Sequence, residues 1–158
     1  MAVRDPLQLD DQLCFALYSA SRAVIRAYAP LLQPLGLTYP QYLVLLVLWE
    51  HDGASVGELG ERLALDSGTL TPLLQRLEHQ GVVERRRGDD DERVVRIHLT
   101  AAGRALRGKA RKIPGALACR AGYDLDAGGL RDLVRLRDEL TELARRLRGA
   151  PDPDPDRG

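Results

Sequence analysis

The side chains with the greatest capacity for chemistry in this sequence are two cysteines, Cys14 and Cys119, which lie more than a hundred positions apart. The thiolate form of cysteine is a nucleophile and a metal ligand. In a reducing cytoplasm, a pair with this separation seldom forms a permanent disulfide. Either both cysteines pack as inert hydrophobic residues, or at least one of them is reactive.

Other kinds of chemical site have no recognisable pattern. The three histidines are scattered without the spacing of zinc ligands, and neither cysteine belongs to a CxxC pair. The sequence also lacks a phosphate-binding glycine loop, a dinucleotide fingerprint and a GxSxG nucleophile elbow. We therefore expect no metal site and no cofactor, and we do not expect an enzyme.

Length and composition are typical of one folded domain. The chain has 158 residues, of which 44% are hydrophobic and 29% are charged. Its 23 basic and 23 acidic residues cancel, which argues against a general polycation but allows a local basic patch. No apolar run reaches the roughly 18 residues that span a bilayer, and the N-terminus does not resemble a signal peptide. We expect a cytoplasmic protein.

Apolar residues at three- and four-residue steps predict the helices that must position these groups. The first predicted helix is Leu7–Leu35, with Pro30 and Gly36 marking its end. The segment Tyr39–Trp49 is apolar on nearly every side, so we expect a helix that is buried all round and capped by Thr38. This helix should form the core.

Two shorter helices and a hairpin follow. Ser55 caps a short helix, and a second helix runs from about Ser67 to Gln80 before Gly81 ends it. The period then changes, because Val82–Arg87 and Arg93–Leu99 are β-prone runs joined by a charged turn. This order predicts a fold that is mainly α with a small β-hairpin wing, a winged helix-turn-helix.

The last part of the chain is predicted to be helical again. Thr100 caps a helix that passes through a basic stretch to Pro114, and Asp126 opens a final amphipathic helix that ends near Leu147. The tail, residues 149–158, alternates proline with aspartate and has no apolar anchor. We expect this tail to be disordered.

The second helix of a winged helix-turn-helix normally enters the major groove of DNA. The side chains that its apolar stripe leaves free can bond phosphates and base edges. For any one of them a solvated helix face is the simpler explanation, but the arginine-rich hairpin that follows favours DNA. The predicted DNA-binding residues are Ser67, Thr69, Thr71, Gln75, Arg76, Arg85, Arg86 and Arg93.

The acidic run Asp89–Glu92 is an objection to DNA binding, because carboxylates repel phosphates. The objection is removed if some of these carboxylates orient the wing arginines by pairing with them. We expect Asp91 to support the wing by pairing with Arg93.

Five segments carry a family resemblance: LDDQLCFALYSASRA, LGLTYPQYLVLLVLWE, LDSGTLTPLLQRLE, DERVVRIHLT and RKIPGAL. Together they are similar to the MarR family, specifically its organic hydroperoxide regulator branch (OhrR), over about residues 7–147. The resemblance implies a homodimeric repressor that binds a double-stranded DNA operator. Residues 7–37 and 113–148 would then be dimerisation helices, and residues 38–112 the winged helix-turn-helix domain.

The resemblance also assigns chemistry to particular residues. The redox-sensing thiol of the family matches Cys14, and the tyrosines that hydrogen-bond to it match Tyr28 and Tyr39, the latter from the partner chain. Phenolic hydroxyls stabilise the thiolate that attacks a peroxide O–O bond without neutralising it. Tyr18, one turn after Cys14 on the same helix face, either adds a third donor or simply packs in the core. Phe15 and other apolar neighbours would favour an organic hydroperoxide as inducer.

Cys119 decides the subtype, because the chain resembles the two-cysteine members of the branch. Oxidation would convert Cys14 to a sulfenic acid, and Cys119 of the other subunit, the resolving cysteine, would condense with it to a disulfide. Closing this bond would rotate the winged domains away from DNA half-sites spaced about 34–36 Å apart. Release of the DNA would derepress a gene for a peroxidase that destroys the inducer.

Two alternatives stay open. A thiol peroxidase would use Cys14 as nucleophile, but it has no need of a winged domain, and no basic residue lies within a helical turn of Cys14. A MarR-type repressor could instead bind a small molecule non-covalently, with both cysteines incidental.

Overall fold

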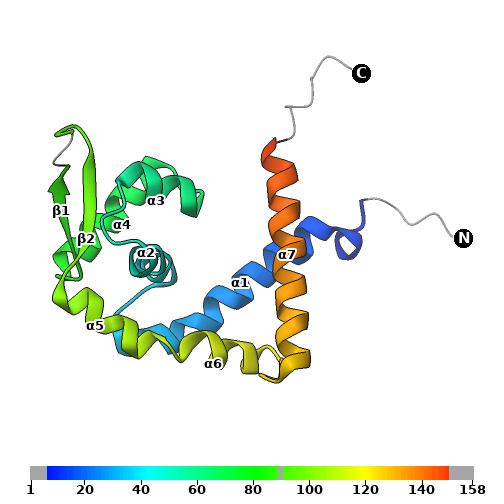
Figure 1. Cartoon of the computed structure of the whole chain (residues 1–158). Helices are drawn as coiled ribbons and strands as arrows, with labels where there is room; N and C mark the ends of the chain where they lie inside the picture. Colours follow the sequence, from blue (N-terminus) through cyan, green and yellow to red (C-terminus); the bar gives the residue numbers. More distant parts are fainter. Residues whose placement is uncertain (1–6, 89–90, 150–158) are drawn as a thin grey trace, which may run out of the picture. The chain divides into compact units, whose positions relative to one another are not determined.

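The computed structural model describes residues 7–88 and 91–149, which form helices and one β-hairpin, as predicted (Figure 1). The chain divides into two compact units, one ending at Ile113 and one starting at Pro114, and each is described by itself. The elements are η1 (Leu9–Asp11), α1 (Leu13–Leu32), η2 (Gln33–Leu35), α2 (Tyr39–Glu50), α3 (Val56–Leu63), α4 (Ser67–His79), β1 (Val83–Arg87), β2 (Val95–Leu99), α5 (Ala101–Ala110), α6 (Ile113–Arg120) and α7 (Ala127–Gly149).

The long first helix is shorter than predicted. α1 begins at Leu13, after the single turn η1, and it continues through Pro30 to Leu32. The expectation that Pro30 marks the end of the helix is therefore wrong. A proline inside a helix removes one backbone hydrogen bond, but Leu32 is fully buried in the core, and this packing keeps the last turn helical. The second end signal is confirmed, because Gly36 has a φ of 68° and closes η2.

α2 lies at the centre of the first unit. Thr38 caps it as predicted, in a capping box: Thr38 Oγ1 accepts from the Gln41 N–H at 3.5 Å, and Gln41 Oε1 accepts from the Thr38 N–H at 2.9 Å. The helices α1, α3, α4 and α5 and the strand β2 all pack against α2. Leu46 is exposed, so the prediction of a helix buried all round holds for most of its circumference.

α3 and α4 form the predicted helix-turn-helix. Ser55 caps α3, and Asp66 caps α4 by accepting from the Thr69 N–H at 2.7 Å. Ala64 adopts a left-handed conformation, with a φ of 53°, in the turn between the two helices. The apolar stripe of α4 is buried as predicted, through Leu70, Leu73, Leu74 and Leu77.

The hairpin pairs β1 with β2 in an antiparallel register that starts at Val83 and Leu99. The loop before α3 fixes it to the body of the unit. The Gly53 N–H donates to the Ile97 carbonyl at 3.1 Å, and the Ile97 N–H donates to the Ala54 carbonyl at 2.9 Å. These two backbone hydrogen bonds therefore hold β2 of the wing against the loop before α3.

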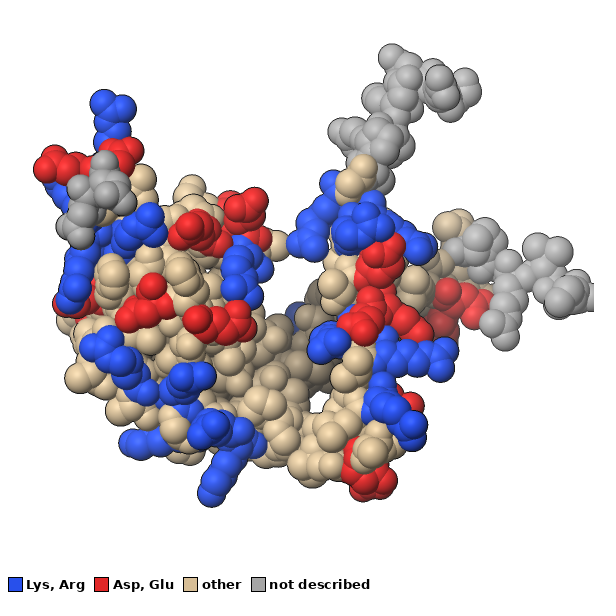
Figure 2. Space-filling view, in the orientation of Figure 1, with Lys and Arg blue, Asp and Glu red and all other residues tan. Residues whose placement is uncertain are grey.

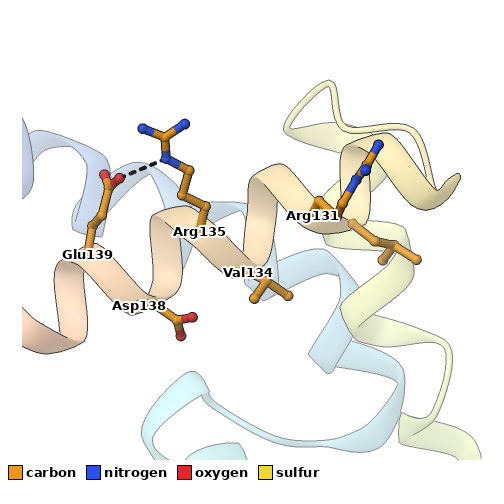
Figure 3. Close-up of a pocket in the computed structure, with 6 residues that line it drawn as sticks. Arg131, Val134, Arg135, Asp138 and Glu139 are labelled. Atoms are coloured by element: carbon orange, nitrogen blue, oxygen red, sulfur yellow. Dashed lines mark hydrogen bonds and ion pairs between the residues drawn. The ribbon is translucent and has the colours of Figure 1, made fainter.

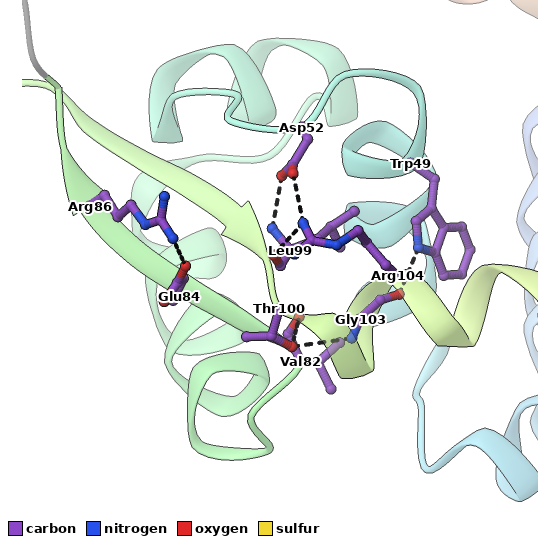
Figure 4. Close-up of polar contacts among 9 residues, drawn as sticks. All are labelled: Trp49, Asp52, Val82, Glu84, Arg86, Leu99, Thr100, Gly103 and Arg104. Atoms are coloured by element: carbon purple, nitrogen blue, oxygen red, sulfur yellow. Dashed lines mark hydrogen bonds and ion pairs between the residues drawn. The ribbon is translucent and has the colours of Figure 1, made fainter.

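Side chains close the base of the hairpin against α5 (Figure 4). Asp52 Oδ1 accepts from the Leu99 N–H at 2.8 Å, and Asp52 Oδ2 lies 3.4 Å from the Arg104 guanidinium. Thr100 caps α5 as predicted, accepting from the Gly103 N–H at 3.2 Å. These contacts connect the base of the hairpin to the loop after α2 and to α5.

The second unit contains α7 and nearly all of α6. Asp126 caps α7 as predicted, accepting from the Gly129 N–H at 2.8 Å. α7 ends at Gly149, so the first residue of the predicted tail is helical, and residues 150–158 lie outside the described part of the chain. No single helix of the described residues is long and apolar enough to cross a membrane; by length and composition alone, Leu13–Leu35 and Tyr39–Glu50 would pass as a pair bent by 70°.

The close packing of α5 against the start of the hairpin can be tested at Gly103. A Cβ added there would lie 2.1 Å from the Val82 carbonyl oxygen, and the Gly103 carbonyl accepts from Trp49 Nε1 at 3.0 Å. We expect Gly103→Ala to lower the free energy of unfolding by about 1–3 kcal/mol in urea denaturation. Gly108→Ala on the same helix is the control, because nothing lies within 4 Å of its added Cβ. Equal stability of the two variants would show that this close approach does not constrain the fold.

Candidate functional site

The exposed face of α4 carries the side chains predicted to read DNA. With the leucines buried, Ser67, Thr69, Gln75 and Arg76 are exposed and Thr71 is half-buried. The helix is therefore apolar toward the core and rich in hydrogen-bonding groups toward solvent. This is the one-sided chemistry that a helix in the major groove requires.

The wing arginines fall into two groups. Arg86 and Arg93 are exposed. Arg85 is directed toward α4, where its Nε lies 3.3 Å from Glu78 Oε2 and its Nη2 donates to the Thr71 carbonyl at 3.5 Å. Arg85 therefore joins the hairpin to α4, which differs from its predicted role as a free DNA contact.

Asp91 contacts Arg93 in a way that differs from the prediction. Asp91 Oδ1 accepts from the Arg93 backbone N–H at 2.9 Å. Within residues 7–88 and 91–149, no carboxylate forms an ion pair with the Arg93 guanidinium. An aspartate two residues before an amide readily closes such a local turn. Among the described residues, the predicted ion pair is replaced by a backbone contact that shapes the wing, and Arg93 is exposed.

Basic side chains gather over the hairpin and along α5 in Figure 2. The net charge of the whole chain is zero, yet the five residues of β1, VERRR, include three arginines. The positive charge that would attract a phosphate backbone is therefore local, as the composition allows.

Cys14 is the second residue of α1, and its side chain is exposed. Tyr18, one turn later, is 59% exposed. The Tyr18 hydroxyl accepts from Arg22 Nη1 at 3.0 Å, and the Arg22 guanidinium carbon lies 5.5 Å from the centre of the ring. In the single chain Tyr18 is therefore not a core residue, and its own O–H proton remains free to be donated.

Tyr28 forms an aromatic cluster with two tyrosines of α2. Its ring centre lies 4.7 Å from that of Tyr39 and 5.7 Å from that of Tyr42. Burial raises the pKa of Tyr28 to about 12, with further contributions from the other two phenols. Burial also raises the pKa of Tyr39 and that of Tyr42. All three phenols stay protonated at neutral pH and can donate hydrogen bonds.

Within one chain, Cys14 does not meet this cluster. Cys14 and Tyr28 are 14 positions apart on the same helix, which at 1.5 Å per residue separates them by about 21 Å. Tyr28 and Tyr39, in contrast, are in contact. At a separation of about 21 Å, Tyr28 does not reach the thiol of its own chain. The expectation that one of the two tyrosines comes from each chain is revised accordingly.

Cys119 lies on α6 and, like Cys14, is a free and exposed thiol. The two cysteines belong to different units of the chain, Cys14 to the first and Cys119 to the second. Both are accessible to an oxidant or to a thiol reagent.

Sequence reasoning missed an amide contact between α2 and α4. Gln41, which is 3% exposed, donates from Nε2 to Gln80 Oε1 at 3.4 Å, and Gln80 Nε2 donates to the Gly36 carbonyl at 3.3 Å. The TxxQ spacing of the capping box points to Gln41, but no sequence signal pairs it with a residue 39 positions away. Tyr42 was also missed, although it lies one helical turn after Tyr39.

Comparisons with known proteins agree with this architecture. Residues 26–109 match the family model for transcriptional regulator SarA/Rot. The chain is 48% identical to the organic hydroperoxide resistance transcriptional regulator of Bacillus subtilis, over 90% of this chain and 94% of that protein. It is 56% identical to the HTH-type transcriptional regulator TtmR of Methylorubrum extorquens, over 86% of this chain and 71% of that protein.

A solved structure of a staphylococcal protein is also similar. Reduced AbfR bound to DNA matches with a TM-score of 0.73 at 34% identity, over 88% of this chain and 94% of that one; AbfR comes from Staphylococcus epidermidis. AbfR in its disulfide form matches with a TM-score of 0.62 at 34% identity, over 90% and 93%. With the winged fold, these relatives show that the chain belongs to the organic hydroperoxide regulator branch of the MarR family of DNA-binding transcriptional regulators.

Proposed function

We propose that two copies of this chain form a repressor that senses organic hydroperoxides. The observation that carries the proposal is the separation, within one chain, of the exposed Cys14 thiol from the half-buried phenols of Tyr28 and Tyr39. A second copy would bring the thiol of one chain to the phenols of the other. The protein would act as a regulator that is oxidised once per signal, without enzymatic turnover.

Exposed apolar faces on α1 and α7 support the proposed dimer. On α7, leucines at positions 133, 136, 140, 143 and 147 recur at steps of three and four, the spacing of a coiled-coil seam. Figure 3 shows Val134 on the same helix, near Arg135, which pairs with Glu139 at 3.0 Å. On a soluble domain, such faces are typical of an interface. The large exposed apolar residues include Leu13, Phe15, Val24, Ile25, Leu130, Val134, Leu136, Leu140 and Leu147.

These faces support the proposed domain assignment. Residues 7–37 and 113–148 would form the dimer, and residues 38–112 would bind DNA. The C-terminal end of α1 has a second role, because Leu32 and Tyr28 pack against the core of the first unit. The proposed dimerisation segment is therefore continuous with the DNA-binding core.

The first chemical step is a two-electron oxidation of Cys14. Its thiolate sulfur attacks one oxygen of the hydroperoxide, the O–O bond breaks, and the leaving alkoxide takes a proton from water to become an alcohol. Cys14 becomes a sulfenic acid. Before the attack, Tyr28 and Tyr39 of the partner subunit would donate to the thiolate, and Phe15 would give the site an apolar wall that favours organic substrates.

The second step joins the subunits. The thiolate of Cys119 of the partner subunit attacks the sulfenic sulfur of Cys14, forms the disulfide and expels hydroxide, which is protonated to water. Closing this bond would rotate the winged domains away from the spacing of successive major grooves, about 34 Å. The reduced, DNA-bound form and the disulfide form of AbfR support such a cycle here. DNA release would derepress a peroxidase gene.

Binding to DNA should depend on the wing. We expect Arg93→Ala to weaken binding by about 1–3 kcal/mol at matched salt, and the affinity of all variants should fall steeply with salt because phosphate contacts release counterions. Fluorescence anisotropy with duplex DNA from upstream of the chain's own gene measures both effects. Arg135→Ala, which removes the same charge from α7, should bind like the wild type. Unchanged affinity of Arg93→Ala would exclude the wing from the interface.

The two cysteines should give different phenotypes. Cys14→Ser should bind DNA and ignore peroxide. Cys119→Ser should still be oxidised at Cys14, but without a resolving thiol the sulfenic acid proceeds to sulfinic acid, so reductant should not return Cys14 to the thiol. Non-reducing electrophoresis of the oxidised wild type should show a dimer band that dithiothreitol removes and that neither variant forms. A disulfide within one chain, or peroxide-driven release that survives alkylation of both thiols, would contradict the mechanism.

Mixed dimers test the pairing between chains. One chain carries Cys14→Ser, and the other carries Tyr28→Phe with Tyr39→Phe, so the mixed dimer has one complete site. Its Cys14 should be oxidised as fast as in the wild type, whereas the homodimer of the phenylalanine chain should react at least about tenfold more slowly, because hydrogen bonds to a charged group contribute about 1.5–3 kcal/mol each. Mass spectrometry follows the oxidation. Equally slow reaction of both dimers would place the phenols and the thiol on the same chain.

A further inference from the structure

Two side-chain amides connect the start of α2 with the end of α4. Gln41 Nε2 donates to Gln80 Oε1 at 3.4 Å, and Gln80 Nε2 donates to the Gly36 carbonyl at 3.3 Å. Gln41 is fixed at its other end too, because its Oε1 accepts from the Thr38 N–H at 2.9 Å. Among the residues that the structure describes, Gln41 is the polar one that is buried, with 3% of its surface exposed. The Gln41 amide is therefore held by hydrogen bonds from two sides, and Gln80 connects it to the exposed end of α4.

The two ends of this connection belong to the two functional surfaces. Gln41 lies two residues after Tyr39, whose ring packs on that of Tyr28. Gln80 is the C-cap residue of α4, and its N–H donates to the Arg76 carbonyl at 3.0 Å. Gln41, Gln80 and Arg76 also line one groove, with a volume of about 610 Å³. A displacement of the phenols can therefore be passed to α4, the proposed DNA-reading helix, through Gln41 and Gln80.

We propose that the Gln41–Gln80 amide pair transmits the redox state of the sensor to α4. This inference rests on the proposed peroxide mechanism and names the residues that carry its signal within one chain. Conversion of Cys14 to the disulfide removes the thiolate that the partner's Tyr39 holds, so the start of α2 shifts, the contact between the two amides changes, and α4 moves with Gln80. The pull of the disulfide on the winged domain would thus reach α4 through these two side chains. Both glutamines are positioning residues. Because coupling is reciprocal, DNA bound to α4 must also stabilise the start of α2.

The experiment measures oxidation and release separately. Gln80→Ala removes the amide contact at an exposed position where the fold should tolerate it, and Gln80→Glu keeps an acceptor oxygen for Gln41. His79→Ala is the matched control, because His79 is an exposed neighbour that lines the same groove. Cumene hydroperoxide is the oxidant. Mass spectrometry follows the oxidation of Cys14, and anisotropy measures the DNA affinity of the reduced and oxidised proteins.

We expect Cys14 to be oxidised at the same rate in all four proteins, and reduced Gln80→Ala and His79→Ala to bind DNA as well as the reduced wild type. Gln80→Glu adds a negative charge, so its oxidised form is compared only with its own reduced form. Oxidation should weaken binding by the same factor in the wild type, Gln80→Glu and His79→Ala, within the range of about 5–150-fold that allosteric couplings span. For Gln80→Ala this factor should be at least about threefold smaller. If oxidation weakens DNA binding by Gln80→Ala as much as it weakens binding by the wild type, the proposal is overturned.

Hydrogen exchange separates failure of this inference from failure of the peroxide mechanism, because it needs no oxidant. DNA binding to the reduced protein should slow amide exchange at the start of α2 in the wild type and Gln80→Glu, and this protection should be lost in Gln80→Ala. A wild type that keeps its DNA after oxidation would contradict the peroxide mechanism alone. Equal protection in Gln80→Ala would overturn the amide connection, whatever peroxide does.

Discussion

Burial of α2 is the constraint on which the first unit depends, because α1, α3, α4, α5 and β2 all pack against this one helix. Its apolar side chains have no favourable place at a surface, and full burial of each large aliphatic residue contributes about 1.5–3 kcal/mol. The same helix carries Tyr39, Tyr42 and Gln41. The packing that stabilises the fold therefore also fixes the phenols of the proposed sensor and the amide that leads from them toward α4.

Local signals were sufficient to predict most of the elements. The caps at Thr38, Ser55, Thr100 and Asp126 are confirmed, since a cap depends on a side chain and a backbone amide three positions apart. Pro30 is the instructive failure. Its helix-ending tendency is a local preference, and the burial of residues beyond it, a tertiary effect, outweighs one missing hydrogen bond.

The candidate site was less predictable, because its contacts join residues that are distant in sequence. The family resemblance named Tyr28 and Tyr39, but their contact follows from the packing of α1 on α2. Charge alone assigned Arg85 to DNA, whereas the fold brings Glu78 within 3.3 Å of it. A sequence lists which groups are available, and tertiary structure decides which of them are already occupied.

In the proposed dimer, a thiol on one chain and phenols on the other make the sensor a property of the pair. A chain diluted below the dissociation constant of the dimer would lose its phenol donors and its second winged domain in the same event. Operator occupancy and peroxide sensitivity would then rise together with the concentration of the protein. At low abundance, a cell would hold single chains that neither repress nor sense peroxide. Every chain that occupies the operator would also be sensitive to the oxidant.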